Sequence, residues 1–285
     1  MAKGNLILGT AKNSVGDVVM YRREGAQITR VRVRNVKNPK TKAQSFQRAI
    51  MAPIAKFYSP LSVVLERSFE GLSKAKSHNK FNQVNANLAR KNKWALPKGT
   101  GFFPLPYQLS QGTIPAVNVT FKDNYPGFDI GIKHEGAQAT TVGQLSSDFI
   151  AAGYKEGDIV TILAVRGNFE QSIYYPVTIQ FEVKKDSTEL LTSLSNNDVS
   201  IASTEDKTYK ILSGSDDCHA CAVIVSRFDG TMWRRSTQSL IVADDLITKV
   251  TADAAVAAAI ASYGMTAGDG NPLVYLDGDE LTDGQ

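Results

Sequence analysis

A series of short β-patterned runs between residues 117 and 250 constrains the fold more than any other feature of the chain. The runs are rich in Val, Ile and Phe, and Gly, Asn, Asp and Ser separate them, which is the pattern of strands joined by turns. Eight strands are predicted: 117–121, 128–132, 159–165, 177–183, 199–201, 209–212, 222–226 and 240–242. Short strands at such spacing are typical of an antiparallel β-sandwich.

The N-terminal third begins with a predicted β-hairpin. Residues 18–22 and 27–34 are β-patterned and flank the Gly-containing connection 23–26. In the second run Arg30, Arg32 and Arg34 alternate with apolar residues and share one face. Their mutual repulsion requires water, acids or phosphates nearby. Because an isolated two-stranded hairpin is marginal in water, we expect this one to pack on its own helices or on another chain.

Three helices are predicted after the hairpin. Thr41 is an N-cap candidate, and Phe46, Ile50, Ile54 and Phe57 follow at helical spacing. Pro53 is expected to kink or split this helix. Ser59 and Pro60 are expected to open a second helix with Leu61, Val64, Leu65 and Phe69 inward, and residues 80–94 form the third.

These elements predict an α+β chain in four parts. They are a basic hairpin-helical module (1–97), a Pro/Gly linker (98–116), a β-sandwich-like domain (117–250), and a C-terminal helix with an acidic tail (251–285). Thr251 is the expected cap of the last helix, and Gly264 its end. Beyond it, Leu273, Val274, Tyr275 and Leu276 form a short apolar run that needs a sheet edge, in this chain or in a neighbour.

The charges are segregated along the chain. Residues 1–103 contain 20 Lys and Arg and four acidic residues, a net +16, whereas the remainder contains 12 basic and 24 acidic residues, a net −12. Such asymmetry indicates partners rather than a fold. The basic part is expected to dock on the acidic part of a neighbouring copy or to contact nucleic acid, and a solvated basic surface is the remaining interpretation.

Catalytic chemistry finds little support in the sequence. Cys218, His219 and Cys221 lack a fourth nearby metal ligand and open a strand rather than a helix, so two structural thiols are expected. Phosphate-binding loops and a nucleophile elbow are absent from the sequence. We therefore expect no catalytic residue, metal or cofactor, and no enzyme activity. Trp233 beside Arg234 and Arg235 is expected either to cover one end of the core or to bind a partner.

Membrane insertion and secretion are not expected either. No apolar run approaches the length of a transmembrane helix, and the N-terminus lacks the apolar region of a secretory signal. The expected site of synthesis is the cytoplasm.

Two stretches of the sequence carry a resemblance to a known family. The residues are Gly9, 15–19, Arg22, Gly25, Gln27, Arg30, 36–41, 43–44 and Arg48, with a second element at 222–227 and 233–238. In these the chain resembles a family of uncharacterised proteins of Bacteroidota and their phages, which crAss-like phages carry among structural genes. The resemblance implies a virion component of the neck or tail.

The function expected from this reasoning is that of a structural phage subunit that forms a ring at the portal, neck or tail. Its expected partners are copies of itself, other virion proteins and, in one version, packaged DNA, with no membrane. The expected interface residues are Arg30, Arg32, Arg34, Lys37, Arg48 and Leu273, Val274, Tyr275 and Leu276. Alternatives are a nucleic-acid-binding module, a cell-surface β-sandwich binding protein and an enzyme with a new kind of site.

Overall fold

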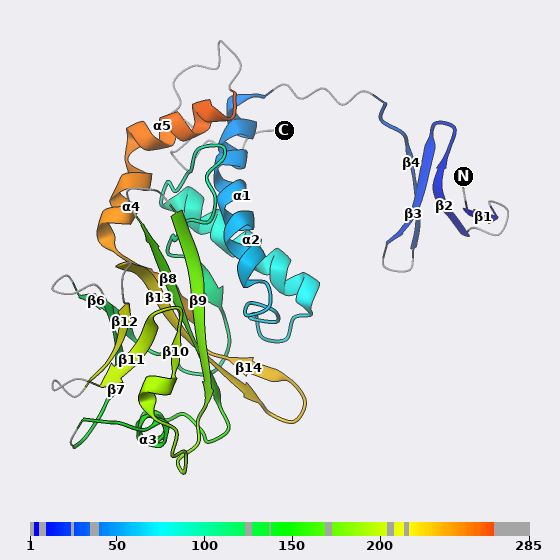
Figure 1. The fold of residues 1–285 in the computed structure, drawn as a ribbon. Coiled ribbons are helices and arrows are strands. Elements are labelled where there is room, and N and C mark those ends of the chain that lie inside the picture. The colour runs from blue at the N-terminus through cyan, green and yellow to red at the C-terminus, as the bar shows by residue number, and fades with distance from the viewer. Residues whose placement is uncertain are drawn as a thin grey trace. The chain divides into compact units, whose positions relative to one another are not determined.

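The structure, a computed structural model, describes residues 3–5, 10–23, 26–34, 40–122, 127–136, 138–168, 173–203, 208–213 and 217–264 (Figure 1). The chain forms two compact units, residues 1–39 (unit 1) and residues 40–285 (unit 2). The expected α+β class is confirmed, because helices and antiparallel sheets occur together.

Unit 1 contains a four-stranded antiparallel sheet in chain order: β1 (Lys3–Asn5), β2 (Thr10–Val15), β3 (Val18–Arg23) and β4 (Ala26–Val31). The predicted hairpin is confirmed as β3 and β4, which pair from Val18–Val31 to Arg23–Ala26. Because β4 ends at Val31, Arg32 and Arg34 lie beyond it, and the predicted ladder of three arginines within one strand is wrong.

The helical layer of unit 2 consists of α1 (Lys42–Leu61), α2 (Lys74–Lys91), α4 (Asp244–Thr251) and α5 (Asp253–Ser262). Thr41 caps α1 by accepting a hydrogen bond from the Gln44 N–H at 3.4 Å, as predicted. The predicted apolar stripe from Phe46 to Phe57 is buried, and Trp94 joins the same core. Figure 1 shows these helices grouped together, away from β6, β7, β11 and β12.

The prolines of α1 do not divide it. Pro53 provides no N–H for the carbonyl of Ala49, but the Leu96 N–H donates to that carbonyl at 3.2 Å, so the helix stays satisfied through residue 53. Pro60 lies in the last turn of the same helix rather than opening a new one. The predicted second helix is therefore wrong. Turns follow α1 instead, although Leu65 and Phe69 are buried as expected.

The central sheet has the order β14-β13-β8-β9. Its strands are β8 (Ile159–Asn168), β9 (Ile173–Glu182), β13 (Asp217–Phe228) and β14 (Trp233–Arg235), and β16 (Ile241–Val242) also pairs with β13. Successive side chains of a strand point to opposite faces of its sheet, and both faces of this sheet are covered. Leu163 and Val165 pack in the helical core, whereas Val160, Ile162 and Ala164 pack in the core of the sandwich.

The outer sheet completes the sandwich with the order β10-β11-β12-β7-β6. Its strands are β6 (Val119–Lys122), β7 (Gly127–Lys133), β10 (Ser195–Asn196), β11 (Val199–Ser203) and β12 (Thr208–Ser213). All eight predicted strands are confirmed, although their ends differ by several residues. The helix α3 (Val142–Ala151) packs against this core with Val142, Leu145 and Phe149.

The segment predicted as a linker, residues 98–116, is packed into unit 2. Leu105, Tyr107 and Leu109 are at most 2 % exposed, and β5 (Gln108–Ser110) pairs with β15 (Gln238–Ser239). This segment therefore joins the helical layer to the sandwich as part of the core.

The predicted C-terminal helix is confirmed as α5. Thr251 does not cap it, because Thr251 is the last residue of α4 and Ala252 is the N-cap of α5. Gly264 follows α5 with φ +77°, in the predicted left-handed conformation. Residues 273–276 and Lys37 lie outside the described residues. No helix within the described part of the chain has the length and hydropathy that a membrane span requires.

Candidate interaction surfaces

Several of the described apolar side chains of unit 1 are exposed or only half-buried. Among its described side chains, Met20 is buried at 7 % exposure, whereas Val31 and Val33 are 73 % and 66 % exposed. Val18 and Val31 are paired opposite each other on one face, and Tyr21 and Ile28 on the other. Val18, Tyr21 and Ile28 are each half-buried. Among the described side chains of unit 1, Met20 alone is buried.

The expected interface arginines of unit 1 lie at one end of β4. The guanidinium of Arg30 lies 5.8 Å from the centroid of the Tyr21 ring. Arg34 forms an ion pair with Asp17, and the Arg32 N–H donates to the Asp17 carbonyl at 2.6 Å. The expected relief of charge repulsion is thus supplied in part by an acid of the same unit. Arg48 belongs to unit 2, on α1, where it is half-buried.

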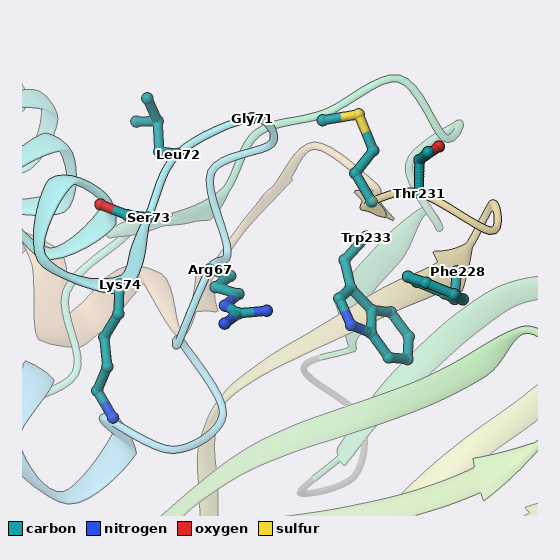
Figure 2. Close-up of a pocket in the computed structure, with 9 residues that line it drawn as sticks. Arg67, Gly71, Leu72, Ser73, Lys74, Phe228, Thr231 and Trp233 are labelled. Carbon is teal, nitrogen blue, oxygen red and sulfur yellow. The ribbon is translucent and has the colours of Figure 1, made fainter.

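A second surface lies between the turns that follow α1 and the hairpin of β13 and β14. We call it the hairpin groove, and it is a hollow of about 340 Å³ (Figure 2). The side chains that define it are Arg67, Leu72, Lys74, Phe228, Met232 and Trp233. A second hollow of about 570 Å³ shares Gly71, Leu72 and Met232 with it and is also lined by Glu70, Lys80 and Arg234.

The apolar part of the hairpin groove comes from one cross-strand pair. Phe228 on β13 and Trp233 on β14 are paired in register, and their ring centroids lie 5.4 Å apart. Phe228 is 55 % exposed and adjoins Trp233, so the two rings form one partly exposed apolar surface. Arg235 lies 5.5 Å from the Trp233 ring centroid. In Figure 2, Phe228, Trp233 and Arg67 all border the same hollow.

Glu70 holds the wall beside the groove together. Its carboxylate accepts hydrogen bonds from Arg234 Nη1 at 2.5 Å and from the Thr113 N–H at 2.9 Å. Burial raises the pKa of Glu70, but the hydrogen bonds from Arg234, Thr113 and the Arg235 N–H outweigh burial and leave the pKa below its usual value. Glu70 is therefore ionised at neutral pH and joins the turns after α1 to β14.

Asp229 shapes the tip of the hairpin. It accepts hydrogen bonds from the Met232 and Thr231 N–H groups at 2.8 and 3.0 Å and from Arg234 Nε at 2.7 Å. The backbone N–H groups, followed by Arg234, hold the pKa of Asp229 well below its usual range. Both carboxylates beside the groove are thus engaged by Arg234, and the remaining charge of the lining is positive.

The two cysteines have the environment of structural thiols. Cys218 and Cys221 are buried on β13 and form no disulfide, and a register irregularity lies between Cys218 and Ala220. Burial, followed by the neighbouring Cys218, raises the pKa of the Cys221 thiol, which disfavours the reactive thiolate. Within the described residues, no group of three or more His, Cys, Asp or Glu side chains is placed to hold a metal ion.

A polar cluster that the sequence did not reveal lies inside the sandwich. Asp148 on α3 accepts a hydrogen bond from Tyr209 OH at 2.5 Å and lies 2.7 Å from His134 Nδ1. Tyr209 is fully buried and His134 is 8 % exposed. Burial, and then the bond to Asp148, raises the pKa of Tyr209, so its hydroxyl stays protonated as a donor. The cluster ties α3 to the outer sheet.

The N-terminal part of the chain is similar to a known family. Residues 9–124 match a family of unknown function, DUF6266. The match includes β2, β3 and β4 of unit 1 and continues through α1, α2 and β5 to β6 of unit 2. Neither the curated proteins nor the solved structures contain a match. The similarity therefore covers strands β2 to β4 of the unit 1 sheet and the Arg67 side of the hairpin groove, but not Phe228 or Trp233.

Proposed function

We propose that this chain is a structural subunit that acts by assembly, and that a neighbouring copy covers the sheet of unit 1. The observation that carries the proposal is the exposure of Val31 at the end of β4 and of Val33 just beyond it, while Met20 is the one buried side chain among those described in unit 1. A small sheet needs a covered apolar face for stability in water. A neighbouring subunit that covers this face would stabilise the sheet of unit 1.

The edges of unit 1 support the same role. Within the described residues, β1 pairs only with β2 and β4 pairs only with β3, so the outer side of each strand is open. Open strand edges accept strands from other chains, and monomeric proteins usually block them. Neighbouring subunits can therefore add to this sheet at an edge as well as on a face.

Charge supports docking between different surfaces of two copies. Residues 1–39 contain eight Lys and Arg and two acidic residues, a net +6, whereas the rest of the chain contains 24 basic and 26 acidic residues, a net −2. A basic unit that docks on a less basic body forms a heterologous contact, and such contacts close into rings or continue as filaments. The proposed assembly is a ring in a phage portal, neck or tail, and this placement rests on the family resemblance alone.

The experiment is a measurement of the mass of the full chain in solution over a range of protein and salt concentrations. We expect self-association that weakens as salt rises, because unit 1 carries a net charge of +6 and the rest of the chain a net charge of −2. Val31→Glu introduces a charge on the exposed face of β4 and should weaken self-association about tenfold. The matched control is Leu190→Glu in unit 2, since Leu190 is 59 % exposed.

Two outcomes would overturn the proposal. One is a strictly monomeric chain at every protein and salt concentration. The other is self-association that Val31→Glu leaves unchanged, because the unit 1 sheet would then not be the surface that a neighbour covers.

The net charge of unit 1 also favours nucleic-acid binding as a second candidate function. If it binds DNA, the logarithm of the binding constant should fall linearly and steeply with the logarithm of salt concentration. Arg30→Glu should then reduce DNA affinity, whereas Val31→Thr, which adds no charge, should not. Self-association without DNA binding would leave assembly as the function.

A further inference from the structure

We propose that the hairpin groove binds the C-terminal segment of a second copy, residues 273–280, through the apolar run 273–276 and the acidic residues that follow it. This goes beyond the proposed function, because it names a different pair of surfaces and does not depend on how unit 1 is covered. The proposal rests on the chemistry of the groove, on the sequence of the segment and on the reach of the chain.

The groove offers an exposed apolar wall with fixed geometry. Phe228 and Trp233 are held side by side by the pairing of β13 with β14, and Met232 lies beside them at the tip of the hairpin. The tip is itself fixed by the hydrogen bonds from Thr231, Met232 and Arg234 to Asp229. A preformed wall of aromatic and methionine side chains loses little conformational entropy when an apolar segment binds.

The opposite wall supplies positive charge. Arg67 is exposed in a left-handed conformation with φ +55° and borders the hollow beside Trp233 (Figure 2). No ion pair of Arg67 occurs within the part of the chain that the structure describes. Lys74 also lines the groove and lies 3.1 Å from Glu66, and Lys80 lines the adjoining hollow. The acid in that lining, Glu70, is already bound by Arg234 and Thr113.

The C-terminal segment has the complementary order of groups. Residues 273–276 read Leu-Val-Tyr-Leu, and Asp277, Asp279 and Glu280 follow directly. The apolar run suits the wall formed by Phe228, Met232 and Trp233, and the acidic residues suit Arg67 and the two lysines. Apolar anchors beside charged pairs are a common form of peptide recognition, in which burial gives affinity and charge gives orientation.

The reach of the chain favours a second copy as the donor. A Cβ on Gly264 would lie 3.5 Å from Lys40 Cδ, so the end of α5 lies near the start of α1. The groove lies beyond the other end of α1, whose 20 residues span about 30 Å. The nine steps from Gly264 to Leu273 reach at most about 32 Å when fully extended. The chain's own segment would need full extension along the helix, whereas a neighbour's segment has no such constraint.

The test uses a labelled peptide of residues 271–283 and measures its binding to the full chain by fluorescence anisotropy. The receiving chain carries Leu273→Ser and Leu276→Ser, so that its own tail does not compete. We expect saturable binding that Phe228→Ser and Arg67→Glu each weaken about tenfold. The matched controls are Leu190→Ser, at another exposed apolar residue, and Lys91→Glu, at an exposed cation on α2, and both should bind the peptide as the parent does.

The specificity of the peptide is tested with two altered probes. A peptide with Asp277, Asp279 and Glu280 replaced by Lys should not bind, and a scrambled peptide of the same composition should bind at least about tenfold more weakly. Thermal unfolding of each variant separates lost binding from lost folding, and Phe228→Ser should unfold normally because Phe228 is more than half exposed.

Absence of peptide binding to a folded chain would overturn the inference, as would equal binding to the Phe228→Ser and Arg67→Glu variants. The Val31→Glu variant should bind the peptide as the parent does. If it does so while self-association is lost, the inference stands independently of unit 1. If the parent chain self-associates in a way that Val31→Glu weakens but the peptide does not bind, the inference fails and the proposed cover of unit 1 does not. A parent chain that is monomeric at every concentration would overturn both.

Discussion

Glu70 joins segments that are more than 40 residues apart in the sequence, since its partners include Thr113 and Arg234. Its lowered pKa means that the folded state binds the proton less tightly than the unfolded state. The resulting stability is therefore fully present above the unfolded pKa of about 4.3 and is lost as pH falls below it.

We predict that Glu70→Gln lowers the free energy of unfolding at neutral pH by about 1–3 kcal/mol, the range for hydrogen bonds to a charged group. The difference in the free energy of unfolding between parent and variant should become smaller as pH falls from about 5 to about 3. Urea unfolding across this range measures it. Glu66→Gln is the control, because its ion pair with the exposed Lys74 should contribute less than about 1 kcal/mol. A difference that stays constant with pH would contradict the assignment of charge to Glu70.

Gly112 is predicted to tolerate no side chain. A Cβ there would overlap the carbonyl oxygen of Arg235 and lie 2.6 Å from Glu70 Oε2, and backbone cannot move aside as a flexible side chain can. Gly112→Ala should therefore destabilise the chain by about 1–3 kcal/mol. Gly101→Ala is the control, since a Cβ at Gly101 meets nothing within 4 Å. If the two variants have equal midpoints of thermal unfolding, the carbonyl of Arg235 does not lie as close to Gly112 as described.

At the residue scale, the sequence indicates which residues act together only when they are neighbours in the sequence. Trp233 stands out in the sequence because two arginines follow it, and Cys218 and Cys221 were expected to be structural thiols because they open a strand rather than a helix. Glu70 and Phe228 were missed, because their roles depend on contacts between the turns after α1 and a hairpin more than 150 residues later. No local period encodes such contacts.

At the scale of elements, the N-terminus of α3 has a complete capping box. Thr141 Oγ1 accepts from the Gln144 N–H at 3.3 Å, and the Thr141 N–H donates to Gln144 Oε1 at 3.1 Å. Thr141→Ala should lower the free energy of unfolding by about 1 kcal/mol. Thr141→Ser keeps the hydroxyl and should restore most of it. If thermal denaturation finds the two variants equally destabilised, the methyl group rather than the cap is responsible.

Whether a strand or helix can be predicted from the sequence depends largely on its length. Six of the eight predicted strands span four or more residues, which is long enough to show a β pattern, whereas β10, β14 and β15 have two or three residues and show none. The short runs 199–201 and 240–242 were predicted from their Val and Ile residues. The continuity of α1 through Pro53 was not predictable, because it depends on the Leu96 N–H reaching the Ala49 carbonyl. The turns after α1 kept the predicted inward positions of Leu65 and Phe69 without the predicted helix.

At the scale of the whole molecule, the two units have unequal internal cover. Both faces of β8 are packed in unit 2, whereas the sheet of unit 1 has one buried side chain among those described. In dilute solution we predict that amide hydrogens of β3 and β4 exchange with solvent much faster than those of β8 and β13. They should become protected at concentrations where copies associate. Hydrogen–deuterium exchange measures both, and equal protection in the dilute chain would contradict the prediction.

The two tryptophans lie in different environments, so their fluorescence reports on different parts of the molecule. Trp94 lies in the helical core at 5 % exposure, and Trp233 borders the hairpin groove. A Trp94→Phe chain therefore emits only from the groove, and its emission maximum should move to shorter wavelength when an apolar segment displaces water there. A Trp233→Phe chain emits only from the core, so its spectrum should change on denaturation and stay constant on ligand addition.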